Sequence, residues 1–207
     1  MLASPQMTKP GIRKQILALR EQLVPDRRAA YSAAISARIA KLEIYRQADA
    51  VLGYMNFGAE FVSDLWVQQV LADGKKLALP RMNRHTNQLD LYWVDDLENQ
   101  LAAGLWGIRE PVVERCERLE ALNEVEFALL PGVAFSRNGA RLGYGGGFYD
   151  KLLARQGGGN GAHKPALAAA AFALQIVEQI PQEATDVKVE WIITEQETIA
   201  CPGQGNP

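Results

Sequence analysis

The sequence is poor in the residues that bind soft metals or form disulfides, since its 207 residues include two cysteines and two histidines. Cys116 and Cys201 show no CxxC spacing, and with only His85 and His163 beside them a zinc site lacks the ligands it needs. We therefore expect both thiols to be reduced, in the cytosol, without a structural role.

An excess of one charge and long apolar runs are also absent. Lys and Arg number 22 against 24 Asp and Glu, so the formal net charge of -2 gives no basic field for a nucleic acid backbone or an anionic membrane surface. No apolar run approaches the roughly 20 residues that span a bilayer, and residues 1–7 show no basic patch before an apolar stretch. We expect a soluble cytoplasmic monomer without nucleic acid or membrane partners.

What is present is an ordinary globular composition, 48% hydrophobic and 22% charged, which is enough for one substantial core. No internal repeat or clean linker divides the chain. We predict one α/β domain over residues 8–200, with a disordered N-terminus at residues 1–7 and a disordered tail at residues 201–207.

Apolar residues spaced three and four apart predict a pair of helices at the start of the chain. Thr8 can cap the first helix, which has Pro10 in its first turn, and Asp26 can cap a second that runs to about Leu42. The side chains expected to face inward are Ile12, Ile16, Leu19 and Leu23 on the first helix, and Ala30, Ala34, Ile35, Ile39 and Leu42 on the second.

Short apolar segments then alternate with helical ones. Residues 50–55 and 76–79 are predicted as strands around a helix at 63–72, and further strands are predicted at 88–94, 127–130, 166–172 and 191–194. This alternation indicates an α/β domain with a mostly parallel central sheet covered by helices on both faces. Residues 109–123 are charged and lack a strand period, so we expect a long connection with one helical turn; residues 156–163 are expected to form a mobile loop.

The most informative segment, residues 129–153, begins at the end of a buried strand and continues into a glycine-rich loop and a helix. Five glycines stand from Gly139 to Gly147, and such a loop lets backbone N–H groups and a helix N-terminus converge on an anion. Arg141 adds donors for phosphate oxygens. The spacing matches neither common phosphate motif, so a plain turn stays an alternative. Asp150 either binds Mg²⁺ beside a phosphate or complements the dipole of its helix.

Further motifs accompany this loop in a fixed order. The loop run comprises Pro131-Gly132, Phe135, Gly139, Arg141-Leu142-Gly143, Gly145, Gly147 and Tyr149-Asp150. The others are Lys9, Arg13 and Arg20; Phe57 and Glu60; Leu79-Pro80-Arg81; Trp106-Gly107-Ile108 and Glu110-Pro111; Gln175, Val177, Ile180 and Pro181; Asp186; and Ile192-Ile193-Thr194. In order and spacing, nearly the whole chain resembles the 5-formyltetrahydrofolate cyclo-ligase, or methenyltetrahydrofolate synthetase, family.

The resemblance implies an ATP site. Lys9 and Arg13 would bind ATP, and they stand four residues apart on one helix face. The glycine loop would contribute Gly139, Arg141, Leu142, Gly143, Tyr144, Gly145, Gly146, Gly147, Phe148 and Tyr149. Of these, Arg141 and Tyr149 would be catalytic. Without the resemblance, Lys9 and Arg13 would be taken as solvated charges.

The resemblance also implies a folate site and a Mg²⁺ site. Folate would contact Phe57, Glu60, Trp106, Tyr144, Gly145, Gly146, Gly147 and Phe148, and Asp150 with Asp186 would bind Mg²⁺. By residue type alone, Phe57 and Trp106 are equally typical of packed aromatics, and Glu60 of a surface charge.

Three positions bear on how closely the family pattern applies. Ser136 stands where the family commonly has Asp, and Tyr144 occupies a position that varies among relatives. Pro10 lies between Lys9 and Arg13, so a helix starting there would move Lys9 off the shared face.

The implied activity is the ATP- and Mg²⁺-dependent conversion of 5-formyltetrahydrofolate to 5,10-methenyltetrahydrofolate, with release of ADP and phosphate. Phosphorylation of the formyl oxygen would make it a good leaving group, so that N10 can close the ring. No covalent enzyme intermediate is needed, which agrees with the lack of a nucleophile–histidine pattern. Two alternatives stay open: an ATP-dependent enzyme for another formamide or carboxylate, and a catalytically silent folate- or nucleotide-binding protein.

Overall fold

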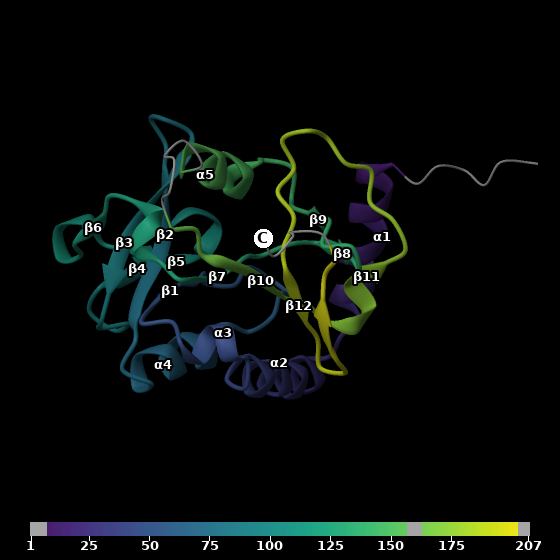
Figure 1. Cartoon of the computed structure of the whole chain (residues 1–207), viewed down its shortest axis with the longest axis horizontal. Helices are drawn as coiled ribbons and strands as arrows, with labels where there is room; N and C mark the ends of the chain where they lie inside the picture. The colour runs from purple at the N-terminus through teal and green to yellow at the C-terminus, as the bar shows by residue number, and fades with distance from the viewer. Residues whose placement is uncertain (1–7, 157–162, 203–207) are drawn as a thin grey trace, which may run out of the picture.

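The computed structural model describes residues 8–156 and 163–202, and a mixed eight-stranded sheet lies at its centre (Figure 1). Neighbouring strands β12, β10, β7, β1 and β2 are parallel, while β13, β3 and β6 pair antiparallel at the two edges. In sheet order the strands are β13 (Thr198–Ala200), β12 (Trp191–Ile193), β10 (Ala166–Ala170), β7 (Phe127–Leu129), β1 (Ala50–Leu52), β2 (Lys76–Asn83), β3 (Gln88–Val94) and β6 (Arg118–Leu119). The predicted mostly parallel sheet is confirmed.

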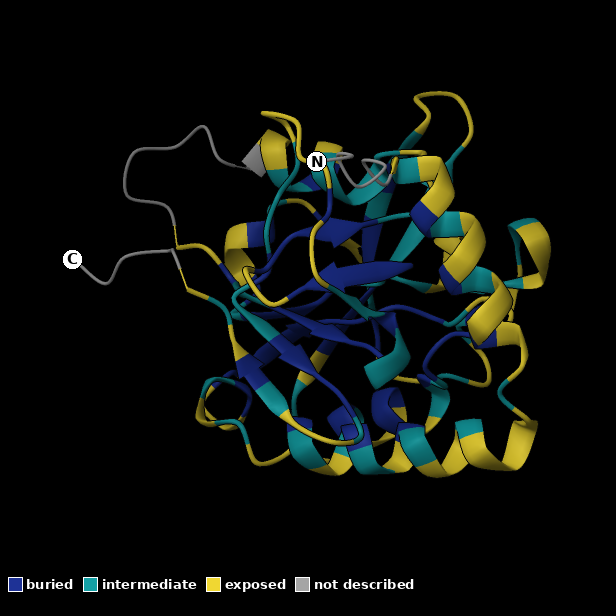
Figure 2. Cartoon of the chain, turned by 90° about the vertical axis from the view of Figure 1, so that its right-hand side faces the viewer, coloured by how far each residue is buried: buried dark blue, intermediate teal, exposed yellow. Residues whose placement is uncertain are grey.

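Helices cover both faces of this sheet, as predicted (Figures 1 and 2). The helices are α1 (Lys9–Glu21), α2 (Pro25–Ile39), α3 (Glu43–Arg46), α4 (Asp64–Ala72) and α5 (Phe148–Gln156). Successive residues of β1 show the two faces: Val51 packs in the cluster that contains α2 and α4, and Leu52 in the cluster that contains α5. The parallel pair β1 and β2 encloses α4, which confirms the predicted β-α-β unit.

The first helix packs away from the central sheet, against a second, small sheet. This sheet has the order β11 (Ile176–Val177), β8 (Ala134–Ser136) and β9 (Arg141–Leu142), and α1 contacts β8 and the 3-10 turn η4 (Ala173–Gln175). Ile12 and Ile16 are buried there as predicted. The inward placement of Leu19 and Ala30 is wrong, because both are exposed and Arg20 is buried instead of Leu19.

The helix α1 begins at Lys9, with Thr8 accepting a hydrogen bond from the Gly11 N–H, so Pro10 does not displace Lys9 from the helix. The second helix begins at Pro25 and ends at Ile39, three residues before the predicted end.

The predicted long connection over residues 109–123 does contain helical turns, but it is wrong in having no strands. The segment contains β5 (Arg109–Pro111), which pairs with β4 (Leu101–Ala103), the edge strand β6, and the 3-10 turns η2 (Val113–Arg115) and η3 (Leu122–Glu124). Strands of two or three residues are too short to show an alternating pattern.

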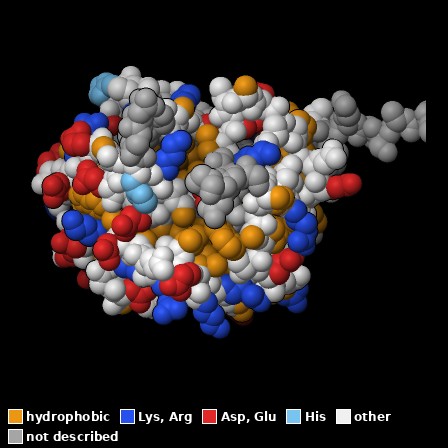
Figure 3. Space-filling model, in the orientation of Figure 1, with side chains coloured by type: hydrophobic (Ala, Val, Ile, Leu, Met, Phe, Trp, Pro, Cys, Tyr) orange, Lys and Arg blue, Asp and Glu red, His pale blue; other side chains and the backbone are white. Residues whose placement is uncertain are grey.

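Both ends of the chain and most of the loop predicted at residues 156–163 lie outside the described residues. Residues 1–7, 157–162 and 203–207 are not described. Cys201, assigned by prediction to the tail, donates its backbone N–H to the Glu190 carbonyl and so belongs to the hydrogen-bonded part of the fold. No helix in the described ranges is long and apolar enough to cross a membrane. On the face in Figure 3, acidic and basic side chains are interspersed around the rim.

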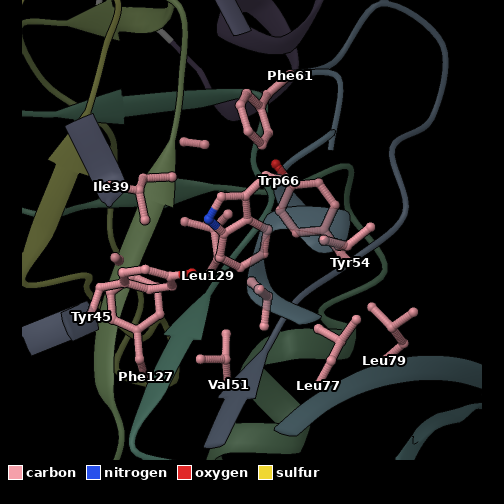
Figure 4. Close-up of a cluster of buried hydrophobic side chains, with 14 of the residues drawn as sticks. Ile39, Tyr45, Val51, Tyr54, Phe61, Trp66, Leu77, Leu79, Phe127 and Leu129 are labelled. Carbon is pink, nitrogen blue, oxygen red and sulfur yellow. The ribbon is translucent and has the colours of Figure 1, made fainter. Parts of the chain in front are cut away.

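Aromatic side chains fill the core on the α2 and α4 face. Trp66 is 1% exposed, and its indole lies among Tyr45, Val51 and Leu77 (Figure 4). The backbone of Gly53 approaches it so closely that an added Cβ would stand 2.9 Å from the ring. This close packing leaves no room for a shifted indole.

We expect Trp66→Ala to lower the free energy of unfolding by about 3–5 kcal/mol, because a large buried ring is replaced by a cavity. Leu65→Ala is the matched control, since the neighbouring Leu65 is 59% exposed and should change stability little. Urea unfolding of both variants measures the difference. Equal losses of unfolding free energy in Trp66→Ala and Leu65→Ala would contradict the burial of Trp66.

Candidate functional site

A cavity of about 500 Å³ opens beside the carboxyl ends of β1 and β7. Parallel α/β sheets bind ligands at such strand ends, and this volume suits a small organic molecule. Its lining residues come from four segments: Tyr54, Met55, Phe57 and Glu60 after β1; Pro80, Met82 and Leu89 on β2 and β3; Trp106, Ile108, Arg109 and Glu110 around β5; and Pro131, Arg141, Gly143, Tyr144, Gly146, Gly147, Phe148, Tyr149 and Asp150. The wall is mainly apolar, with a few charged groups at defined places.

The glycine loop is shorter than predicted. Gly139 lies in the turn between β8 and β9, with φ +86° and its N–H donating to the Ser136 carbonyl, and an added Cβ would meet the Val189 carbonyl. The glycine loop proper is residues 143–147, which lead directly into α5. Asn138-Gly139 is a strong hairpin signal, and it could have identified this turn. The buried Ser136 hydroxyl bonds Asn138 inside the same hairpin, away from the cavity wall.

Within the glycine loop, the backbone conformation requires glycine. Gly145 and Gly147 have φ of +114° and +63°, which L-residues rarely adopt. Gly146 instead lies against a ring, since an added Cβ would stand 2.4 Å from Phe148. The loop therefore carries backbone close to the cavity at the start of a nine-residue helix, where an anion is favoured.

The close contact between the Gly146 backbone and the Phe148 ring predicts the effect of Gly146→Ala. The new methyl group must displace the Phe148 ring that lines the cavity, and such overpacking typically costs about 1–3 kcal/mol. We expect the KM for the cavity ligand to rise about tenfold. Gly74→Ala is the control, because Gly74 has φ +75°, lies after α4 and has open space around it. It should lower stability by about 1–2 kcal/mol without changing KM; similar KM values for both variants would contradict the prediction.

Arg141 and Asp150 form the charged pair at the end of the cavity nearest α5. The Arg141 side chain is 3% exposed; its Nη2 donates to Asp150 Oδ1 at 2.7 Å and its Nη1 to the Pro131 carbonyl at 3.2 Å. Asp150 Oδ1 also accepts the Val187 N–H at 3.2 Å. Asp150 thus joins distant segments, which goes beyond complementing the dipole of its own helix. The guanidinium lies 5.9 Å from the centroid of the Tyr149 ring.

Glu60 and Tyr144 form a second polar group on the wall. The Tyr144 hydroxyl donates to Glu60 Oε1 at 2.7 Å, and Glu60 Oε2 accepts the Phe57 N–H at 2.7 Å. Burial raises the pKa of the Glu60 carboxyl, and the bonds from Phe57 and Tyr144 and the charge of Arg20 oppose that shift. The alternative of a surface charge is wrong for Glu60, which is 5% exposed. Phe57 and Trp106 are 42% and 65% exposed at the cavity, so they are not core aromatics.

Lys9 and Arg13 lie outside the cavity wall and approach it from α1. Lys9 Nζ donates to Asp186 Oδ2 at 2.7 Å and to Glu183 Oε1 at 2.9 Å. Arg13 Nε donates to the Gly143 carbonyl at 2.8 Å, and its guanidinium lies beside Gly145. The two cations therefore share a helix but contact different segments: Lys9 binds residues 183–186, and Arg13 binds the glycine loop.

The charges around Asp186 favour its ionised form. Although partial burial acts against ionisation, bonds from Lys9 and the Glu183 N–H hold the pKa of Asp186 below its ordinary value, with help from the charge of Arg141. Asp186 lies next to Val187, whose N–H binds Asp150, so the two carboxylates predicted as Mg²⁺ ligands come from adjoining segments.

Asp150 and Asp186 can bind Mg²⁺ only through carboxylate oxygens that other bonds leave available. Oδ1 of Asp150 and Oδ2 of Asp186 accept the bonds above, which leaves the second oxygen of each carboxylate outside those bonds. The described ranges contain no cluster of three or more acidic, histidine or cysteine side chains with metal-binding geometry. Two carboxylates are nevertheless what Mg²⁺ uses when phosphates and water supply its other ligands, so the donor set is suitable for Mg²⁺ bound together with a nucleotide.

Sequence reasoning missed several wall residues. Tyr54, Met82 and Arg109 line the cavity, and Arg109 forms an ion pair with Asp64. Side chains such as those of Tyr54 and Met82 carry no sequence signal that separates a pocket from a core, and the charge of Arg109 looks like any other surface charge in the sequence. Of the other predicted positions, Leu142 packs its side chain into the core under α1, and Gly145 lies beside Arg13.

The strand ends, the apolar cavity and the glycine loop together define an α/β protein that binds a ligand at the carboxyl edge of its sheet. The chain belongs to the 5-formyltetrahydrofolate cyclo-ligase family, whose model matches residues 5–195.

Individual relatives agree with this assignment. A 5-formyltetrahydrofolate cyclo-ligase of Mycolicibacterium smegmatis is 30% identical over 73% of this chain and 76% of its own, and a probable one of Caenorhabditis elegans is 28% identical over 80% and 82%. The solution structure of Aquifex aeolicus 5,10-methenyltetrahydrofolate synthetase superposes with a TM-score of 0.80 at 29% identity, covering 96% of this chain and 95% of that one. The synthetase of Mycoplasma pneumoniae, 20% identical with a TM-score of 0.69, supports the fold.

Proposed function

We propose that the cavity is the active site at which 5-formyltetrahydrofolate and ATP meet. The protein is a 5-formyltetrahydrofolate cyclo-ligase, which converts this substrate to 5,10-methenyltetrahydrofolate, and its family implies an ATP-dependent ligase. The observation that supports this location is that Phe57, Glu60 and Trp106 line the same cavity as the glycine loop and Arg141. An aromatic, mainly apolar space suits a pterin ring, and the loop suits phosphates.

On this proposal the folate pterin lies between Phe57 and Trp106. The carboxylate of Glu60 accepts hydrogen bonds from the N–H groups of the pterin, and the Phe57 N–H and the Tyr144 hydroxyl fix its two oxygens. Gly146 and Phe148 close the wall beside the formyl group.

ATP would place its phosphates along residues 143–147. Arg141 and Arg13 supply positive charge on two sides of the loop, and Lys9 reaches the same neighbourhood through Asp186. Asp150 and Asp186 would hold Mg²⁺, which supplies charge neutralisation to the triphosphate when bound. Positioning and charge stabilisation are then the main work of these residues.

The reaction needs activation of the formyl oxygen, because an amide carbon is a weak electrophile and oxide is a poor leaving group. The formyl oxygen forms a bond to the γ-phosphorus while the bond to the ADP oxygen breaks. N10 then adds to the formyl carbon, the C–O bond breaks with departure of phosphate, and N10 loses its proton to solvent. Tyr149 stays neutral in this step, since burial raises the pKa of its phenol above its ordinary value.

A panel of candidate phosphoryl acceptors tests the proposal against its two alternatives. Purified protein with Mg-ATP should release ADP with 5-formyltetrahydrofolate and not with 10-formyltetrahydrofolate or simple formamides. Release of ADP with another formamide or carboxylate alone would favour a different ligase. Binding of both ligands with no ADP release would favour a silent binding protein.

Compartment and assembly stay predictions. The expected cytoplasmic location rests on the sequence, and one relative in Arabidopsis thaliana is a mitochondrial form. The expected monomer is likewise a prediction from the sequence.

A further inference from the structure

Arg20 is a cation buried at a position where α1 otherwise presents apolar side chains. It follows Ile12 and Ile16 at four-residue spacing, and it is 3% exposed. Its Nη2 donates to the Tyr144 hydroxyl, and its guanidinium lies 5.6 Å from the centroid of the same ring. Its Nε and Nη1 are buried without a hydrogen-bond partner in the described parts of the chain. Burying a charge with so few hydrogen bonds costs free energy of folding. An opposite charge nearby, and a function that needs the cation, would explain it.

The compensating charge is Glu60, reached through Tyr144. The Tyr144 hydroxyl accepts from Arg20 and donates to Glu60 Oε1, so one hydroxyl links the cation of α1 to the carboxylate of the cavity wall. Glu60 Oε2 is held by the Phe57 N–H, which fixes the carboxylate from its other side. The three residues form a continuous chain from beneath the cavity to its surface.

We propose that Arg20 is a positioning residue for the folate site: through the Tyr144 hydroxyl it orients Glu60 and keeps that carboxylate ionised as an acceptor for the ligand. Arg20 does not itself line the cavity. The inference rests on the proposed function, because it assumes that the folate binds against Glu60.

The groups that face Glu60 explain why a cation is needed there. Tyr54 after β1, Tyr144 in the glycine loop and Tyr149 on α5 surround the carboxylate, and burial raises the pKa of each phenol, so all three are neutral at physiological pH. Among these groups, Arg20 is the one that carries positive charge. Burial raises the pKa of Glu60 and Arg20 opposes that shift. Loss of Arg20 should therefore move the Glu60 pKa further upward.

The test is the affinity for 5-formyltetrahydrofolate, measured by calorimetry from about pH 5 to about pH 9. In the native protein, affinity should fall on the acid side as Glu60 takes up a proton. In Arg20→Gln this fall should move to higher pH by about one unit, with affinity recovering at the alkaline end. Arg20→Lys keeps the charge and should restore the native midpoint. Tyr144→Phe removes the linking hydroxyl and should shift the midpoint in the same direction as Arg20→Gln.

Glu60→Gln is the matched control, because it removes the titrating group and leaves any titration of the ligand itself. In that background Arg20→Gln should cause no further shift. A midpoint that stays native in both Arg20→Gln and Tyr144→Phe, with affinity lowered equally at all pH values, would overturn the inference and leave Arg20 a structural residue. No binding by the native protein at any pH would overturn the proposed function as well.

Discussion

We expect Arg141→Ala to lower kcat/KM for ATP by about 100- to 10,000-fold. The guanidinium has five donors, and its present bonds to Asp150 and the Pro131 carbonyl hold it beside the glycine loop. Two charge-assisted bonds to phosphate, at about 1.5–3 kcal/mol each, account for a loss of this size. Steady-state kinetics with ATP as the varied substrate measures it.

Controls separate the loss of phosphate binding from loss of the fold. Arg141→Lys keeps the charge without the planar set of donors, so it should recover only part of the activity. Arg137→Ala removes an exposed arginine of the same hairpin, which pairs with Glu197, and should leave kinetics unchanged. The Arg141 pair is buried, so the melting temperature of each variant is needed too. Native kinetics in a folded Arg141→Ala variant would contradict the assignment of Arg141 to phosphate binding.

We expect Asp150→Asn to raise the Mg²⁺ concentration for half-maximal turnover by about 10- to 100-fold. The change removes the negative charge and one oxygen ligand, while an amide oxygen still accepts the bond from Arg141. Turnover measured against Mg²⁺ at fixed ATP gives the shift. Binding of Mn²⁺ in the presence of a non-hydrolysable nucleotide, followed by electron paramagnetic resonance, gives a second readout that is independent of activity.

The matched control is Asp90→Asn, since Asp90 also bonds an arginine, Arg118, and lies on β3 away from the cavity wall. It should leave the Mg²⁺ dependence native. If Asp150→Asn behaves the same way, Asp150 serves only to hold Arg141 and the Val187 N–H. Asp186→Asn extends the comparison, because the same loss there would place both carboxylates at one ion.

The central sheet and the main helices were predictable because each has a periodic pattern long enough to detect. Residues 88–94 show the alternation that the structure confirms as β3 with the same bounds. The α1 stripe was predicted from Ile12 to Leu23. It is confirmed at Ile16 and wrong at Leu19, since a buried arginine at the next position cannot be told from a solvated one by residue type. The short strands β5, β6 and β9 were missed because they depend on tertiary pairing.

The candidate site was predictable as a set of residues and not as an arrangement. Spacing and resemblance pointed to Phe57, Glu60 and Arg141, which the structure brings to one cavity. The partners of the charges were not predictable: Lys9 bonds Asp186, 177 residues away, and only the folded chain brings them together. The placement of Gly139 in a hairpin turn was missed although Asn138-Gly139 signals it.

Transfer of the formyl oxygen is the most direct test of the account. We would supply 5-formyltetrahydrofolate labelled with ¹⁸O at the formyl group, with Mg-ATP, and follow the near-ultraviolet absorbance of the methenyl product together with ADP and the isotope content of the released phosphate. Phosphorylation of the formyl oxygen predicts one ADP for each methenyl group formed and the ¹⁸O in phosphate. Methenyl product with the label lost to water, or ADP formed without the methenyl product, would contradict it.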